Sequence, residues 1–400
     1  MVEEAQEQKA PTENFVDQFA RFYTPVVFLL AIVIMIFPPL FGVGIWQDWF
    51  YRGLELLVVA CPCALVISTP VAIVSAIGNA ARNGVLMKGG IFLEKAHSIT
   101  TIAFDKTGTL TEGKPKVTDI KTFSGSKEEL LSIALTLESF STHPIAKAIV
   151  DDAIERGIAS TPGEMFQTMV GKGVQAMFEE MAIPIAEVIT EVEALINQGK
   201  TVVLVGTKEK VIGVIAVSDR IRESTANTLT ALKQNGVKQT VILTGDHEGA
   251  AKLIASEANI DHYYAELLPE DKVDVIKALQ SEGQKVAMVG DGINDAPALA
   301  TADIGIAMGG VGTDTAMETA GIVLMADHLE KLPYTMKLSR KTLGIIKQNI
   351  WFSIIVKLIA LILIFPGWLT LWLAVLSDTG AALIVILNSI RLLRYKEKNE

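Results

Sequence analysis

Asp105 stands where a carboxylate could accept a phosphoryl group. It ends the apolar, β-rich run Thr101–Asp105 and is followed directly by the segment Lys106–Thr109, which reads KTGT. A carboxylate at the end of a strand can attack a phosphoryl group while the following backbone amides and hydroxyls hold its oxygens. A lone aspartate after a strand is more often a helix cap, so this interpretation depends on companions elsewhere in the chain.

Three later motifs supply those companions in an order that suits phosphoryl transfer. Thr244, in a TGD motif, offers a hydroxyl to a phosphate oxygen. Lys272, in a PEDK motif that opens a helix, can neutralise the charge of the transition state. Asp291 and Asp295, in a GDGIND motif, provide two carboxylates for Mg²⁺, a hard cation that takes oxygen ligands. With Asp105 they form a complete set of groups for phosphoryl transfer.

A second candidate site lies in an apolar segment. Cys61 and Cys63 bracket Pro62, and a proline there opens a helix and frees backbone carbonyls beside the two thiols. Two cysteines can also pack as small buried hydrophobic residues, which is the commoner use of cysteine. Thiolates select soft or borderline ions, so the pattern favours Zn²⁺, Cd²⁺, Pb²⁺ or Cu⁺.

Two charged residues in later apolar segments narrow the choice of ion. Lys357 and Asp378 both lie within such segments. Charges deep in a membrane are costly and are usually paired or functional, although Lys357 could instead extend toward the interface. A carboxylate beside two thiolates suits a divalent ion better than Cu⁺. We therefore expect Cys61, Cys63 and Asp378 to bind one divalent ion, with Lys357 as a counterion that pairs with Asp378 when the ion is absent.

The elements that must hold these residues are of two kinds. The chain has 400 residues, 50% hydrophobic and 20% charged, which suits long membrane segments joined to an ordinary soluble portion. A net charge of −10 argues against nucleic acid as a partner, and two cysteines exclude a disulfide scaffold. Four apolar stretches reach or approach the roughly 20 residues that cross a lipid bilayer, namely 23–44, 53–77, 350–365 and 368–390.

Basic residues around these stretches predict their orientation. Lys and Arg flank the stretches mainly on the side of the central soluble insert, against Arg52 alone on the other side. The flanking residues are Arg82, Lys88, Arg340, Lys341, Lys347, Arg391, Arg394 and Lys396. We therefore expect a multi-pass protein of the cell (inner or plasma) membrane, with the insert and both termini in the cytoplasm.

The insert alternates β-rich runs with helical patterns, which predicts a parallel α/β sheet with helices on both faces. The runs are 101–105, 200–206, 211–219, 239–246, 285–291 and 303–309, and the helical patterns include 222–236, 248–259 and 269–282. Several runs end in a carboxylate, at the sheet edge where such folds bind ligands. Residues 114–198 interrupt the rhythm and are expected to form an inserted second domain.

Taken together, the motifs DKTGTLTEG, TGD, PEDK and GDGINDAP resemble those of the P-type ATPases, within the haloacid-dehalogenase-like superfamily. The Cys-Pro-Cys motif at 61–63 and the STHP segment at 141–144 resemble the heavy-metal branch. Asp378-Thr379-Gly380 resembles the last-span signature of its Zn²⁺/Cd²⁺/Pb²⁺ subgroup. The Tyr-Asn and Met-Ser-Ser signals of the copper subgroup do not occur in these spans.

The resemblance implies a role for each candidate residue. Asp105 would accept the γ-phosphate of ATP, and Mg²⁺ would be bound by Asp105, Asp291 and the Thr107 carbonyl. The phosphoryl group would be held by Thr244, Lys272 and Asn294. In the nucleotide-binding domain, His143 would lie near adenine, with Glu138, Gly171 and Gly173 nearby.

The resemblance also implies the domain organisation. A Rossmann-like phosphorylation domain (78–114 and 199–330) would be interrupted by an α+β nucleotide-binding domain (115–198), which is shortened after Val174. The remaining parts would be a polar N-terminal segment (1–22), two transmembrane hairpins (23–77 and 350–390), a linker helix (331–349) and a C-terminal tail (391–400).

The main hypothesis is ATP-driven export of Zn²⁺, Cd²⁺ or Pb²⁺ through an aspartyl-phosphate intermediate, by a partial version of such a pump. Family members begin with further spans and an actuator domain, and this chain starts just before what resembles the fifth of eight spans. We therefore expect the actuator to be absent or supplied by a separate chain. One alternative is a transport-dead membrane protein that binds metal or a partner.

Two further alternatives are weaker, a copper-type pump and a membrane-tethered phosphatase. Soluble phosphatases of this superfamily usually carry an aspartate two residues after the nucleophile, where this chain has Thr107.

Overall fold

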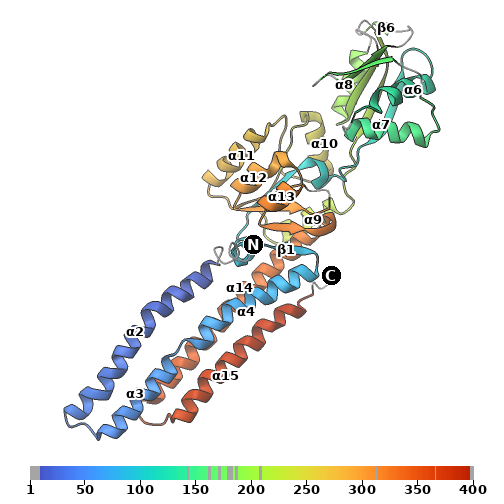
Figure 1. The fold of residues 1–400 in the computed structure, drawn as a ribbon. Coiled ribbons are helices and arrows are strands. Elements are labelled where there is room, and N and C mark those ends of the chain that lie inside the picture. Colours follow the sequence, from blue (N-terminus) through green and yellow to red (C-terminus); the bar gives the residue numbers. More distant parts are fainter. Residues whose placement is uncertain are drawn as a thin grey trace. The chain divides into compact units, whose positions relative to one another are not determined.

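The computed structural model describes residues 10–141, 144–160, 164–169, 173–177, 183–184, 188–206, 210–310, 313–364 and 366–396. The chain divides into two compact units (Figure 1). The first, which we call the helical unit, comprises Met1–Ser98, Gly321–Met325 and Lys331–Glu400. The second, the α/β unit, comprises Ile99–Ala320 and Ala326–Glu330.

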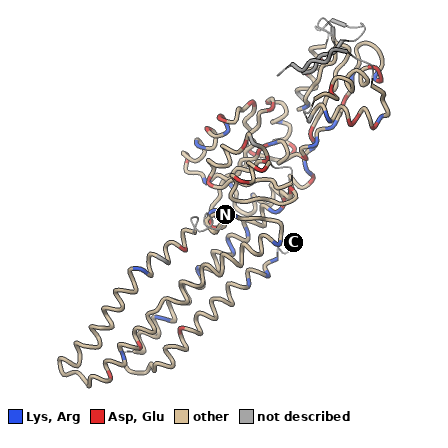
Figure 2. Tube along the Cα trace, in the orientation of Figure 1, with Lys and Arg blue, Asp and Glu red and all other residues tan. Residues whose placement is uncertain are grey.

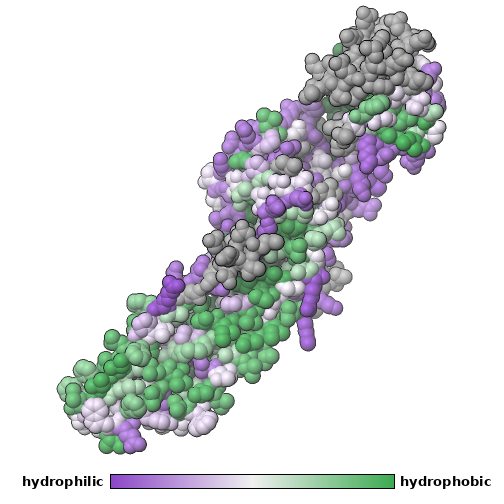
Figure 3. Space-filling model, in the orientation of Figure 1, coloured by the Kyte–Doolittle hydropathy of each residue, from purple (hydrophilic) through white to green (hydrophobic). Residues whose placement is uncertain are grey.

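The helical unit contains four candidate membrane spans, and each of the four predicted apolar stretches lies mainly within one of them. The long helices are α2 (Pro11–Leu40), α3 (Trp46–Ala60), α4 (Cys63–Arg82), α14 (Lys331–Ile364) and α15 (Leu371–Ile390). Their surfaces are rich in exposed Leu, Ile, Val and Phe (Figure 3), and charges along them are sparse (Figure 2). An apolar exterior of this extent requires a lipid environment. Helix α14 is continuous, so the expected linker helix 331–349 and the third span form one element.

The second span is interrupted at the Cys-Pro-Cys motif. Helix α3 ends at Ala60 and α4 begins at Cys63, while Cys61 has the non-helical dihedrals φ −58° and ψ 120°. A proline ring clashes with the preceding helical turn and cannot donate a backbone hydrogen bond, so the helix breaks just before Pro62. The break leaves the carbonyls of Val59 and Cys61 available to a side chain from another helix, and Lys357 donates to both.

The α/β unit is built on a parallel sheet whose strands follow the order β12, β11, β2, β9, β10. These strands are β12 (Ile304–Met308), β11 (Val286–Gly290), β2 (Thr101–Asp105), β9 (Gln239–Leu243) and β10 (His262–Tyr264), and each neighbouring pair is parallel. Helices α9 (Thr225–Gln234), α10 (Glu248–Ala258), α11 (Pro269–Ser281) and α12 (Ala296–Thr301) alternate with the strands. The predicted α/β fold is confirmed, and the strand that ends in Asp105 lies at its centre.

Two of the predicted parallel strands belong elsewhere. β7 (Thr201–Gly206) and β8 (Lys210–Ser218) pair antiparallel, in a second sheet with β3 (Lys116–Thr122) and β6 (Ile183–Pro184). The expected boundary of the inserted domain at residue 198 is therefore wrong, because its sheet continues to Ser218.

Burial of β8 on both faces explains why its sequence predicted a strand of the parallel sheet. Along β8, Ile215 and Val217 pack toward α6 (Lys127–Glu138) and α7 (Pro144–Glu155). Val214 and Ala216 pack on the opposite face with the cluster that includes Leu195 of α8 (Ile189–Asn197). A strand covered on both faces loses its polar alternation and reads like a strand of a parallel sheet.

The start of the phosphorylation domain also differs from the expectation. β1 (Val85–Met87) pairs antiparallel with β13 (Ile322–Leu324), and α5 (Gly90–Ala96) follows β1. The Ser339 hydroxyl of α14 donates to the Leu93 carbonyl of α5. Residues 78–98 and 321–325 therefore belong to the helical unit. The remaining elements are the β4 (Glu164–Met169) and β5 (Gly173–Met177) hairpin, α13 (Asp314–Thr319) and the short helical turns at 106–110, 293–295, 325–327 and 391–394.

Candidate functional site

The carboxyl edge of the parallel sheet brings the phosphoryl-transfer motifs together. Asp105 is the last residue of β2 and lies in register with Leu243, the residue before Thr244. On the other side of β2, strand β11 ends at Gly290, directly before Asp291. Because neighbouring parallel strands end at the same edge, residues far apart in the sequence surround the Asp105 carboxylate.

Lys272 connects two of these carboxylates. It lies in the first turn of α11 and is only 5% exposed. Its Nζ atom lies 2.6 Å from Oδ1 of Asp105 and 2.7 Å from Oδ1 of Asp295. Burial opposes the lysine charge, but the two carboxylates outweigh it and raise the pKa of Lys272 above its usual value. Lys272 is thus a buried cation placed beside the predicted nucleophile.

Three carboxylates form a candidate Mg²⁺ site. One oxygen from each of Asp105, Asp291 and Asp295 lies within 4.8 Å of the others. Burial and then the Asp295 carboxylate raise the pKa of Asp105 to about 6, against the opposing effect of Lys272. Burial and then the carboxylates of Asp105 and Asp295 raise the pKa of Asp291 to about 7. Mutual repulsion among buried carboxylates favours a bound cation, and the all-oxygen donor set fits Mg²⁺.

A glycine provides the space for this cluster. Gly108 has φ +72°, and a Cβ atom added there would lie 1.8 Å from Oδ2 of Asp291. Any other residue would therefore displace the Asp291 carboxylate and would strain the loop. The glycine of the KTGT segment is required both for the turn and for the acidic cluster.

The other predicted residues of this site differ in burial. Thr244 is 2% exposed, and its hydroxyl accepts from the backbone amide of Asp246. Thr107 and Asn294 are exposed, so their side chains can reach a ligand from solvent. Asp246, which we did not single out from the TGD motif, forms an ion pair with Lys106.

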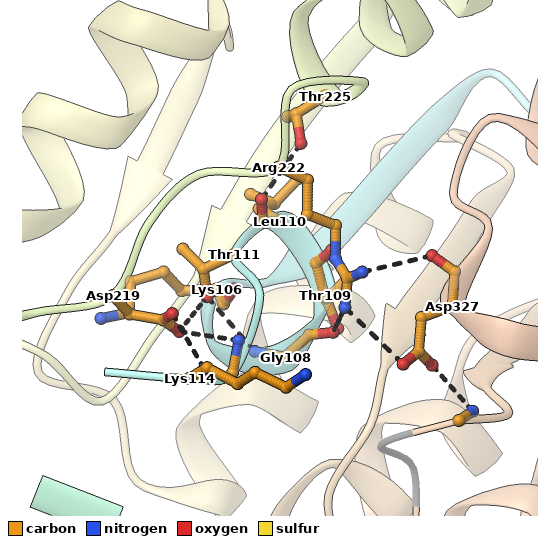
Figure 4. Close-up of polar contacts among 12 residues, drawn as sticks. Lys106, Gly108, Thr109, Leu110, Thr111, Lys114, Asp219, Arg222, Thr225 and Asp327 are labelled. Atoms are coloured by element: carbon orange, nitrogen blue, oxygen red, sulfur yellow. Dashed lines mark hydrogen bonds and ion pairs between the residues drawn. The ribbon is translucent and has the colours of Figure 1, made fainter. Parts of the chain in front are cut away.

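The loop that follows Asp105 is held from both sides by residues that the motifs did not identify (Figure 4). Arg222 donates to the carbonyls of Gly108 at 2.8 Å and Thr109 at 3.1 Å, and to the carbonyl of Asp327 at 3.4 Å. Asp219 accepts from the Thr111 hydroxyl and from the backbone amides of residues 113 and 114. These contacts fix the backbone that follows Asp105, the segment predicted from the sequence to hold the oxygens of a phosphoryl group.

Sequence reasoning missed Asp219, Arg222 and Asp327. Asp219 ends an apolar run in the same way as Asp105, and this position was the available signal. For Arg222 the sequence carries no local sign, because its partners lie 114 residues away at Gly108.

The predicted nucleotide residues are only partly covered. Glu138 is the last residue of α6, and Gly173 begins β5. His143 and Gly171 lie outside the described residues.

The membrane candidate site joins the interrupted span to α14 and α15. Lys357 of α14 lies 3.1 Å from Oδ1 of Asp378 on α15, and its Nζ atom also donates to the carbonyls of Val59 and Cys61. The Lys357 and Asp378 side chains are only 16% and 17% exposed. The sulfurs of Cys61 and Cys63 are joined as a disulfide, so binding of a metal by thiolates requires its reduction.

Comparison with known proteins agrees with this description. Residues 99–303 match the family model of the haloacid dehalogenase-like hydrolases. The parallel sheet, with Asp105 at its carboxyl edge, therefore defines a domain of that class. A cadmium-transporting ATPase of Staphylococcus aureus is 51% identical over 100% of this chain and 57% of its own length. A zinc/cadmium/lead-transporting P-type ATPase of Escherichia coli (strain K12) is 46% identical over 98% of this chain and 54% of its own.

Solved structures give the same result. The crystal structure of a zinc-transporting PIB-type ATPase in its E2.Pi state matches with a TM-score of 0.82 and 46% identity, over 98% of this chain and 66% of that one. The chain belongs to the P-type ATPases of the heavy-metal type. It spans a little over half the length of the curated relatives it matches.

Proposed function

We propose that this chain forms the catalytic and ion-conducting portion of an ATP-driven exporter of divalent heavy-metal cations, Zn²⁺, Cd²⁺ or Pb²⁺. The observation that carries the proposal is the position of Asp105 at the centre of the sheet edge, with Lys272 and two further carboxylates around it. The copper-type alternative and the phosphatase alternative are both disfavoured by the names of the relatives, which are cadmium-transporting and zinc/cadmium/lead-transporting ATPases.

In the proposed reaction an Asp105 carboxylate oxygen attacks the γ-phosphorus of ATP. A bond forms between that oxygen and phosphorus, the bond to the β,γ-bridging oxygen breaks, and ADP leaves with the bonding electrons. Lys272 stays within 2.6 Å of the attacking carboxylate and offsets the negative charge that gathers there. Mg²⁺, held by Asp291, Asp105 and the Thr107 carbonyl, would supply further charge neutralisation when bound.

The chain's other residues hold the acceptor site in place. Arg222 and Asp219 hold the backbone after Asp105, so the amides that face the phosphoryl oxygens need not reorganise during transfer. The buried Thr244 hydroxyl and the exposed Asn294 side chain are proposed to contact the transferred group. We propose that ATP binds through the domain containing Glu138, His143, Gly171 and Gly173.

The transported ion is proposed to bind between Cys61, Cys63 and Asp378 after the disulfide is reduced. Two thiolates and one carboxylate carry three negative charges, which a divalent ion and Lys357 together neutralise. A monovalent ion would leave one negative charge uncompensated in a medium of low dielectric. We propose that Lys357 pairs with Asp378 when the ion has left, consistent with their 3.1 Å contact.

We also propose that the α/β unit and both termini are cytoplasmic, which the basic residues that flank the spans support. The relatives are longer than this chain, and a portion equivalent to their remainder, on the same or a separate polypeptide, would complete the pump.

Phosphorylation of Asp105 tests the proposed function. The chain in detergent, with Mg²⁺ and γ-³²P-labelled ATP, should incorporate acid-stable label that hydroxylamine removes, and Zn²⁺ under reducing conditions should change the amount. Asp105→Asn should abolish the label. Asp261→Asn, which changes a carboxylate hydrogen-bonded to the amino end of β9, is the control and should keep it. Label that survives Asp105→Asn would sink the assignment.

A further inference from the structure

A buried hydroxyl without a partner lies beside the proposed ion site. Ser353 of α14 is 1% exposed. Its Oγ atom is among the few buried side-chain polar atoms in the described residues that have no hydrogen-bond partner. A polar group without a hydrogen-bond partner is unfavourable in an apolar membrane interior, and a bound ligand would remove this cost.

A hydroxyl group in a helix usually donates a hydrogen bond to a carbonyl of its own helix. Serine and threonine in helices commonly donate to the carbonyl four residues earlier, and Thr335 and Thr342 do so on this same helix. Ser353 does not.

Ser353 lines a small cavity with two residues of the proposed site, Lys357 and Asp378. The cavity is also lined by Ser377, and by Val59 and Ala64, which flank the Cys-Pro-Cys motif. The space open to the centre of a water-sized sphere is about 10 Å³, which suits one water molecule or one dehydrated ion. Because Ser353 lies four residues before Lys357, both side chains emerge from one face of α14.

A second serine in the same cavity provides the contrast. Ser377 of α15 also lines the cavity, but its hydroxyl donates to the Ala374 carbonyl at 2.8 Å. Ser377 is therefore satisfied by its own helix, whereas Ser353 has an oxygen to offer. The two residues have the same chemistry and line the same cavity, and only the Ser353 hydroxyl lacks a hydrogen-bond partner.

We propose that the Ser353 hydroxyl is an oxygen ligand of the transported divalent ion and biases the site toward Zn²⁺ over the softer Cd²⁺. This inference rests on the proposed function. Cys61, Cys63 and Asp378 supply three donors, and a neutral hydroxyl adds a fourth without disturbing the charge balance with Lys357. Oxygen donors favour harder ions and sulfur donors favour softer ones, so the ratio of the two affinities depends on Ser353.

Competition binding tests the inference. The reduced chain in detergent would be titrated with Zn²⁺ and with Cd²⁺ against a chelator of known affinity. Ser353→Ala should weaken Zn²⁺ binding by about tenfold or more and Cd²⁺ binding by clearly less. Ser377→Ala is the matched control and should leave both affinities near those of the wild type. Ser353→Cys should shift the ratio toward Cd²⁺.

The outcomes separate the inference from the proposed function. Wild-type binding of one ion per chain, with an unchanged Zn²⁺/Cd²⁺ ratio in Ser353→Ala, overturns the role of Ser353 and leaves the function intact. Equal changes in Ser353→Ala and Ser377→Ala also overturn it. A wild-type chain that binds neither ion when reduced overturns the proposed ion site itself. Thermal unfolding of each variant shows whether an effect is merely structural, because a loss of fold would weaken the binding of Zn²⁺ and of Cd²⁺ equally.

Discussion

Lys272 lies 2.6 Å from Asp105 although 167 residues separate them in the chain. The same amino group lies 2.7 Å from Asp295, so one buried cation serves two carboxylates of the acidic cluster. The three carboxylates of Asp105, Asp291 and Asp295 lie close together, and the positive charge of Lys272 reduces the repulsion among them. The contact therefore links the stability of the sheet edge to its chemistry.

Replacing Lys272 should harm both stability and phosphorylation. Lys272→Met leaves two buried carboxylates without their partner, which typically costs about 3–5 kcal/mol. We expect a lower unfolding temperature, partly restored by Mg²⁺, and no ³²P incorporation. Lys277→Met, at an exposed position on the same helix, is the control. A variant at Lys272 that melts like the wild type without Mg²⁺ would show that the cluster is stabilised in another way.

Arg222→Lys should slow phosphorylation without abolishing the fold. Arg222 donates to the carbonyls of Thr109, Asp327 and Gly108 from three separate nitrogens, whereas the donors of a lysine all lie on one nitrogen, so the loop after Asp105 would lose its fixed position. We expect the rate of ³²P incorporation to fall by about 10- to 100-fold. Arg220→Lys, whose side chain is 71% exposed, is the control and should retain the wild-type rate. Equal rates in both variants would exclude a positioning role for Arg222.

The stability of the Mg²⁺-free chain should decrease as pH rises. The pKa of Asp291 is raised to about 7 and that of Asp105 to about 6, above their unfolded value of about 4. The folded chain therefore binds more protons than the unfolded chain between about pH 4 and 7, and it loses stability as these protons leave. The measurement is the unfolding temperature from pH 5 to 8, with and without Mg²⁺. Added Mg²⁺ should stabilise the chain most at pH 8, where the carboxylates are ionised.

Two variants check the origin of this pH dependence. Asp291→Asn should flatten the dependence of stability on pH, because it removes the carboxyl group whose pKa is raised further than that of Asp105. Asp261→Asn should not, because the pKa of Asp261 is lowered and this carboxylate stays ionised across the range. A wild-type chain whose stability rises steadily from pH 5 to 8 without Mg²⁺ would contradict the assignment.

Metal binding should depend on the redox state of Cys61 and Cys63. The disulfide withholds both sulfurs, so the oxidised chain should bind no Zn²⁺ at the membrane site. A phosphine reductant should restore one Zn²⁺ per chain, and the double variant Cys61→Ala with Cys63→Ala should bind none in either state. Stoichiometric Zn²⁺ binding by the oxidised chain would place the ion elsewhere.

Asp378→Ala should also remove stoichiometric Zn²⁺ binding, because Lys357 would then face the ion without its partner. Lys357→Met should instead retain or strengthen binding, since it removes a positive charge from the site. Isothermal titration of the reduced variants would measure both affinities. Wild-type affinity in Asp378→Ala would exclude the carboxylate as a ligand.

Much of this protein follows from the sequence by itself. The parallel strands, the helices between them and the four spans are recognisable because hydrophobic periodicity and length are local properties. The motifs at Asp105, Thr244, Lys272 and Asp291 predicted the chemistry of the sheet edge, since strand ends in such a sheet meet at one side. The Cys-Pro-Cys motif predicted the break in the second span through the chemistry of proline alone.

Only the tertiary structure decided which sheet each strand joins and which polar groups find partners. β7 and β8 belong to the antiparallel sheet. The sequence did not show this, because strands buried on both faces have the same apolar pattern in parallel and antiparallel sheets. Arg222 meets Gly108 across 114 residues, and no local pattern encodes such a contact. Ser353 and Ser377 look alike in the sequence, yet one hydroxyl is satisfied by its own helix and the other is not. Hydrogen-bond satisfaction depends on side-chain rotamer and packing, which arise only when the helices assemble.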